Sequence, residues 1–102
     1  MVEIEIELVR PVNPAGRSFI TYIYGAMAAK NREVIDKYKK EFTKLIQRLG
    51  FKIEEIIGTG KLITGKIVIS LDSNNKPTKA YTAELGIWNI EKTSKEKIEV
   101  TV

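Results

Sequence analysis

Aliphatic and acidic residues alternate in the first stretch of the chain: Val2, Glu3, Ile4, Glu5, Ile6, Glu7 and Leu8. A period of two places the aliphatic side chains on one face and the carboxylates on the other, so the pattern predicts a half-buried β-strand. Two prolines and a glycine follow within residues 10–16, and such a segment cannot continue a β-ladder. The sequence therefore predicts a first strand that ends near Arg10.

Residues 31–49 show the periodicity of an amphipathic helix. Their apolar members recur at steps of one, three and four, which places them on one arc of a helical wheel: Val34, Ile35, Tyr38, Phe42, Leu45, Ile46 and Leu49. Gly50 stands where helices commonly end, and Arg48 would lie in the last turn. The pattern predicts one long helix whose apolar arc packs on a sheet.

Residues 18–30 carry two conflicting signals. Apolar residues recur at helical spacing, namely Phe19, Tyr22, Ile23, Ala26 and Met27. The run Phe-Ile-Thr-Tyr-Ile-Tyr at 19–24 is nevertheless typical of strands. We favour a helix from about residue 18 that continues into, or is kinked against, the helix at 31–49; a strand is the alternative.

Four further runs are rich in β-forming residues: 51–57, 61–71, 78–91 and 97–102. Their short connections require antiparallel neighbours. In the last run, Ile98, Val100 and Val102 are expected to point inward beside the first strand. Residues 1–102 are therefore predicted to form a single α+β domain with an antiparallel sheet of about five strands. The expected order is a strand, a helix or helix pair, and a four-strand meander, with one long amphipathic helix packed on one face.

The residue types that are missing restrict the chemistry of the chain. Its 102 residues include no histidine and no cysteine. Zinc sites of the Cys/His type, thiolate nucleophiles and Ser–His–Asp triads are therefore excluded. Glu54 and Glu55 are adjacent in a predicted strand, where neighbouring side chains point to opposite faces, so they do not form a catalytic pair. We expect a non-enzymatic protein without catalytic residues, cofactor or metal ion.

The hydropathy of the chain indicates an intracellular, cytoplasmic protein without a membrane partner. The longest apolar stretch, residues 19–29, is too short to span a bilayer. The acidic start of the chain is opposite in charge to a signal peptide. The abundance of Ile, Lys and Glu is typical of thermophilic proteins, although an AT-rich genome gives a similar bias.

Positive charge is concentrated in the predicted helical region. The net charge of the chain is +4, but residues 17–50 hold eight basic residues against three acidic ones. Five basic residues fall on one flank of the predicted helix, three of them at intervals of seven: Lys30, Lys37, Lys40, Lys44 and Arg48. Such a row of cations can follow the phosphates of a nucleic acid without reading its sequence. The alternative is an ordinary solvated helix face with ion pairs such as Glu33–Lys37 and Glu41–Lys44.

Aromatic residues offer a second indication of nucleic-acid binding, because bases stack on them. Tyr22, Tyr24, Tyr81 and Trp88 are the candidates. If the strand at 78–91 is regular and the face that contains Tyr81 belongs to the core, Trp88 points outward. A bulge at Gly86 would instead reset the alternation and bury Trp88, and a lone tryptophan is more often part of a core.

These observations lead to two functional hypotheses. The first is a small protein that binds DNA or RNA, largely independently of sequence, through the basic flank of the helix. Its expected contact residues are Lys30, Lys37, Lys40, Lys44, Arg48, Arg10 and Arg17, supported by Trp88 and Tyr24. The second is a structural or assembly subunit that forms a homodimer or joins a larger complex through a sheet edge or the Trp88 face.

Overall fold

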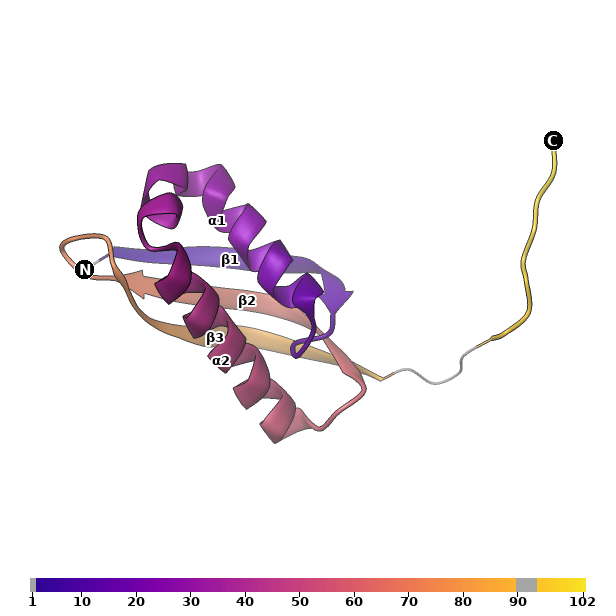
Figure 1. Cartoon of the computed structure of the whole chain (residues 1–102). Coiled ribbons are helices and arrows are strands. Elements are labelled where there is room, and N and C mark those ends of the chain that lie inside the picture. The colour runs from indigo at the N-terminus through magenta and orange to yellow at the C-terminus, as the bar shows by residue number, and fades with distance from the viewer. Residues whose placement is uncertain (1, 90–93) are drawn as a thin grey trace.

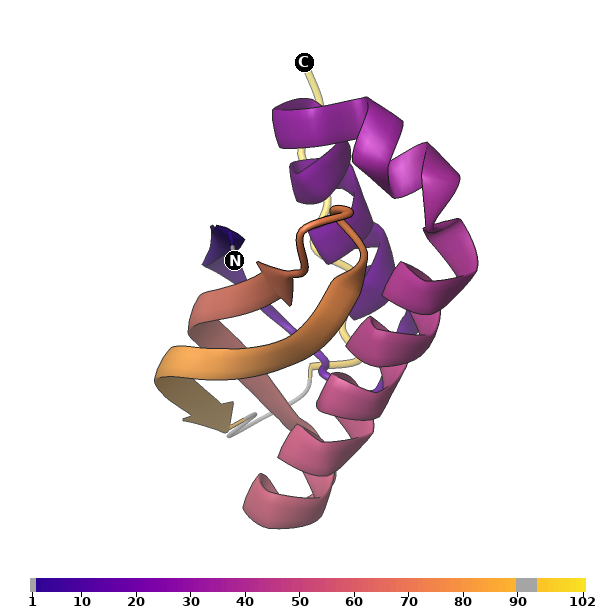
Figure 2. The same cartoon turned by 90° about the vertical axis from the view of Figure 1, so that its left-hand side faces the viewer.

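The computed structural model describes residues 2–89 and 94–102, and its sheet has three antiparallel strands in the order β1-β2-β3 (Figure 1). The elements follow one another as β1 (Val2–Val12), α1 (Arg17–Lys37), α2 (Lys39–Ile57), β2 (Lys61–Leu71) and β3 (Pro77–Asn89). Both helices lie over the same face of the sheet, and the opposite face is open (Figures 1 and 2). The predicted α+β domain with an antiparallel sheet is confirmed, whereas the expected number of about five strands is wrong.

Both layers contribute to a continuous core. β1 and β2 pair so that Ile4 faces Ile69 and Ile6 faces Ile67, and these side chains meet the helices. Fully or nearly fully buried side chains come from all elements except β3: Ile6, Leu8, Phe19, Ile23, Met27, Ile35, Phe42, Ile46, Ile53, Ile63, Ile67, Ile69 and Leu71. The aliphatic face of the first strand is thus the buried face, and residues 18–30 are helical, as favoured from their spacing.

The helical region differs from the expectation of one helix at 31–49. The chain breaks at Tyr38, so α1 ends at Lys37 and α2 begins at Lys39. Gly50 does not end α2. Its lack of a side chain instead allows the loop before α1 to come close, since a Cβ there would lie 2.0 Å from the carbonyl oxygen of Pro14. Residues 51–57, predicted to be a strand, extend α2 by two further turns.

A bulge in β3 decides which aromatic side chains are exposed. Lys66 pairs with Glu84, but the next residue of β2, Ile67, pairs with Thr82, so Ala83 has no partner. The extra residue reverses the alternation and places Tyr81 and Trp88 on the same open face of the sheet. The strand is therefore not regular, the face that contains Tyr81 is not part of the core, and the bulge lies at Ala83 rather than at Gly86, the alternative position considered from the sequence. Trp88 is 53% exposed.

The end of the chain does not join the sheet. Residues 94–102 form no strand and extend away from the body of the molecule (Figure 1). Ile98 and Val100 are 88% and 92% exposed, and Val102 is also exposed, so the prediction of an inward-facing strand at 97–102 is wrong for the described structure. Residues 90 and 91 of the predicted strand 78–91 lie outside the described residues.

Candidate nucleic-acid interface

The outer side of α2 carries a row of cations. Phe42, Ile46, Gly50 and Ile53 form its buried side. Lys40, Lys44 and Arg48 follow one another at intervals of four residues on the opposite side, and all three are exposed. With a rise of 1.5 Å per residue, the row extends over about 12 Å. These three residues are called the α2 basic face below.

Ion pairs do not neutralise this surface in the described part of the chain. The ion pairs among residues 2–89 and 94–102 are Lys52–Glu55, Lys66–Glu5 and Lys97–Glu99, all with exposed side chains. The pairs Glu33–Lys37 and Glu41–Lys44, which would have made the row an ordinary solvated face, are not among them. The cations of the α2 basic face are therefore available to an external anion.

The junction of α1 and α2 carries two cations that lie against aromatic rings. Lys39 Nζ is 5.9 Å from the centroid of the Tyr24 ring, and Lys37 Nζ is 5.3 Å from that of Tyr38. Tyr38 occupies the N-cap position of α2 without a side-chain hydrogen bond, so no side chain caps the first amides of this helix. The positive end of the helix dipole and the lysines beside it favour an anion. Lys39 was missed in the sequence because its position depends on the break at Tyr38.

Tyr24 also lines a hollow between the two helices. The hollow has a volume of about 380 Å³, and it is formed by Ile20, Thr21, Tyr24, Gly25, Lys39 and Thr43. Gly25 leaves it open, because no atom lies within 4 Å of the position of a Cβ. The hollow thus combines an aromatic ring, small side chains and one cation.

The other predicted contact residues lie elsewhere. Lys30 donates a hydrogen bond from Nζ to the backbone oxygen of Glu5, so its side chain lies against β1 and not beside α2. Arg10 lies in β1 and Arg17 is the first residue of α1; both are exposed, and the loop between them packs on Gly50 of α2. Trp88 lies on the open face of the sheet, which is the face opposite the helices (Figure 2). The structure therefore places Lys40, Lys44 and Arg48 in one row on α2 and Tyr24 beside Lys39 at the start of that helix, but it brings neither Lys30 nor Trp88 to this row.

The open face of the sheet is acidic. It carries Glu3, Glu5, Glu7 and Glu84 against Lys66 and Lys79, so these six residues have a net charge of −2. The Tyr81 hydroxyl donates a hydrogen bond of 2.7 Å to Glu3 Oε2, and Ser70 Oγ donates one of 3.2 Å to the same oxygen. The hydrogen bond to Glu3 raises the pKa of Tyr81 above its ordinary value of 10.0, with smaller contributions from desolvation and from the charges of Glu3 and Glu5.

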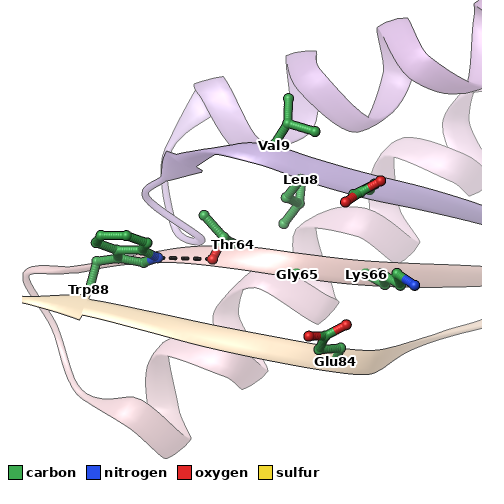
Figure 3. Close-up of a pocket in the computed structure, with 8 residues that line it drawn as sticks. Leu8, Val9, Thr64, Gly65, Lys66, Glu84 and Trp88 are labelled. Carbon is green, nitrogen blue, oxygen red and sulfur yellow. Dashed lines mark hydrogen bonds between the residues drawn. The ribbon is translucent and has the colours of Figure 1, made fainter.

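A second hollow lies on this acidic face (Figure 3). Its volume is about 380 Å³, and Gly65 and Lys66 line it between Trp88 and Glu84. Trp88 Nε1 donates a hydrogen bond of 2.9 Å to Thr64 Oγ1, which holds the indole against the sheet. The neighbouring carboxylates repel a polyanion, so the exposed indole does not make this face suitable for nucleic acid.

Comparison of the chain with protein families, curated proteins and solved structures gave no match. Within the described residues, neither helix has the length and apolar character needed to cross a membrane.

Proposed function

We propose that the chain binds nucleic acid, DNA or RNA, through the α2 basic face and largely independently of sequence. The observation that carries this proposal is the row Lys40, Lys44 and Arg48, which is exposed and forms no ion pair with any described residue. Flexible cations in a row contact phosphates and read no bases. The contact is therefore expected to follow the sugar–phosphate backbone.

The start of α2 extends this contact. Lys39 and the uncapped amides of the first turn add a position for one more phosphate beside the row. The hollow next to Tyr24 has room for an unpaired base, which would stack on the ring while Lys39 pairs with its phosphate. Single strands should consequently bind more tightly than duplexes of the same length.

The test is a titration of a fluorescein-labelled oligonucleotide, followed by anisotropy and repeated at several salt concentrations. Four cations that contact phosphates predict a slope of about −3 for the logarithm of the binding constant against the logarithm of salt concentration. Binding that does not weaken with salt, or no binding in about 20 mM salt, where exposed charges are poorly screened, contradicts the proposal.

A matched pair of charge reversals separates a defined surface from net charge. Lys44→Glu and Lys79→Glu each remove one cation and add one anion, so each lowers the net charge from +4 to +2. Lys44 lies on the α2 basic face and Lys79 on the open face of the sheet. We expect Lys44→Glu to weaken binding about tenfold and Lys79→Glu to have little effect. Equal losses would show that net charge alone attracts the oligonucleotide.

A further inference from the structure

The outer edge of β1 is closed by side chains of α1. The Tyr22 hydroxyl accepts a hydrogen bond of 3.2 Å from the Val9 amide and donates one of 3.1 Å to the Glu7 oxygen. Lys30 Nζ donates to the Glu5 oxygen. Three of the outward backbone groups of β1 are therefore occupied, which hinders the pairing of another strand at this edge.

The outer edge of β3 has no such protection. The backbone N–H and C=O groups of Glu5 and Glu7 in β1 point away from β2. Since these groups alternate in direction along each strand, the register of the three strands places those of Leu85 and Ile87 on the outer side of β3. Among the hydrogen bonds of the described residues, none reaches these outward groups. The Ile87 side chain, which lies on the helix side of the sheet, is 50% exposed. β3 thus offers an additional strand both hydrogen-bonding groups and an incompletely covered apolar surface.

The end of the chain has the pattern of the missing strand. Residues 97–102 alternate between polar and aliphatic side chains: Lys97, Ile98, Glu99, Val100, Thr101 and Val102. Six residues in extended form reach about 20 Å, which is enough to pair with one half of β3. Their aliphatic side chains are exposed to water in the described structure, where they contribute nothing to stability.

The sequence before this segment argues against a turn back onto the same chain. The connections in the body of the molecule use residues suited to a change of direction: Gly58 and Gly60 have φ values of 96° and 77°, and Asn75 has a φ of 65°. Residues 90–96 contain no glycine, proline, asparagine or aspartate. They therefore lack the residue pairs typical of a two-residue hairpin, and the local turn in the described part of this segment is the one in which Ser94 Oγ accepts a hydrogen bond of 3.3 Å from the Glu96 amide.

We infer that residues 97–102 add as a fourth strand to β3 of a second copy of this chain, so that two chains exchange their ends in a symmetric dimer. Ile98 and Val100 would cover Leu85 and Ile87 on the helix side, and the polar residues of the segment would lie on the open face near Trp88. This inference concerns a different surface from the α2 basic face and is independent of nucleic-acid binding.

The test is light scattering on the full chain over a range of concentrations, with variants that separate the two faces of the segment. We expect a mass twice the 11.5 kDa of one chain. Val100→Lys places a charge on the apolar side and should give a monomer, whereas the control Thr101→Lys on the polar side should remain a dimer. Ile87→Pro removes an outward amide of β3 and should also give a monomer with an unchanged circular dichroism spectrum.

Three results would overturn the inference. One is a full chain that stays monomeric at about 100 μM, above the dissociation constant of a typical stable dimer. Another is a dimer that survives Val100→Lys, because the contact would then not involve the end of the chain. The third is a monomer in which the amides of residues 97–102 are protected from hydrogen exchange, because that result would place the strand on its own chain.

Discussion

Two surfaces of this small protein carry charge, and they use it in opposite ways. On the open face of the sheet, Lys66 lies 3.7 Å from a carboxylate oxygen of Glu5, and Glu3 accepts hydrogen bonds from Ser70 and Tyr81. On the outer side of α2, Lys44 and its neighbours form no ion pair with any residue that the structure describes. The open face pairs part of its charge with neighbouring groups and keeps a net charge of −2, whereas the cations on the outer side of α2 have no ion-pair partner among the described residues. Charge on the sheet should therefore govern stability, and charge on α2 should govern binding.

The largest expected effect concerns the backbone contacts beneath both surfaces. A Cβ at Gly65, where φ is 129°, would lie 2.1 Å from the Glu84 oxygen, and one at Gly50 would lie 2.0 Å from the Pro14 oxygen. We expect Gly65→Ala and Gly50→Ala each to lower the free energy of unfolding by about 3 kcal/mol in urea titrations. The control is Gly25→Ala, which meets no atom within 4 Å and should stabilise α1 by about 0.5–1 kcal/mol. Similar results for all three variants would contradict these contacts.

A smaller effect separates the two surfaces directly. Lys66 stands between Glu7 and Glu84 in a cross-strand row, so Lys66→Glu would place three carboxylates side by side. We expect this variant to lose about 1 kcal/mol of unfolding free energy. The same change at Lys44 should stay within about 0.5 kcal/mol, as is usual for an exposed position without a partner. Equal losses of stability in chemical denaturation would remove the distinction between the surfaces.

The smallest expected effect is a change in the pKa of Tyr81 on the open face of the sheet. Because Glu3 holds the pKa of Tyr81 above 10.0, the neutral phenol is favoured in the folded state. The stabilisation that the Tyr81–Glu3 hydrogen bond gives to the folded state is complete at pH values below the pKa of Tyr81 in the unfolded chain. It is lost as the pH rises through the pKa of Tyr81 in the folded state. We expect Glu3→Gln to lower the pKa of Tyr81 in an ultraviolet absorbance titration, with Tyr81→Phe assigning the signal. An unchanged titration in Glu3→Gln would show that the carboxylate does not act on the phenol.

The sequence predicted correctly those features that depend on the residues of a single strand or helix. The alternation of Val2 to Leu8 identified β1 and its buried face, and residues 61–71 coincide with β2. The helical spacing of residues 18–30 outweighed their strand-like composition because Phe19, Ile23 and Met27 are all buried on the sheet.

The features that were not predicted have no clear local signal in the sequence. Gly50 allows Pro14 to approach α2 and does not end the helix, and a sequence gives no sign of that partner. The bulge at Ala83 carries no glycine to mark it, although it exposes Tyr81. The break at Tyr38 divides the row of cations, which removed Lys30 from the site and added Lys39. The approach of Pro14 to Gly50 is a tertiary contact, which a local preference does not reveal.

Nuclear magnetic resonance can observe both surfaces in a single titration. The measurement follows the backbone amides and the indole N–H of Trp88 while a short single-stranded oligonucleotide is added in low salt. We predict that the shifts concentrate on Lys39 to Arg48 and on Tyr24, with the Trp88 indole and Tyr81 unchanged. Shifts confined to Trp88, Tyr81 and their neighbours on the sheet would contradict the assignment of binding to α2.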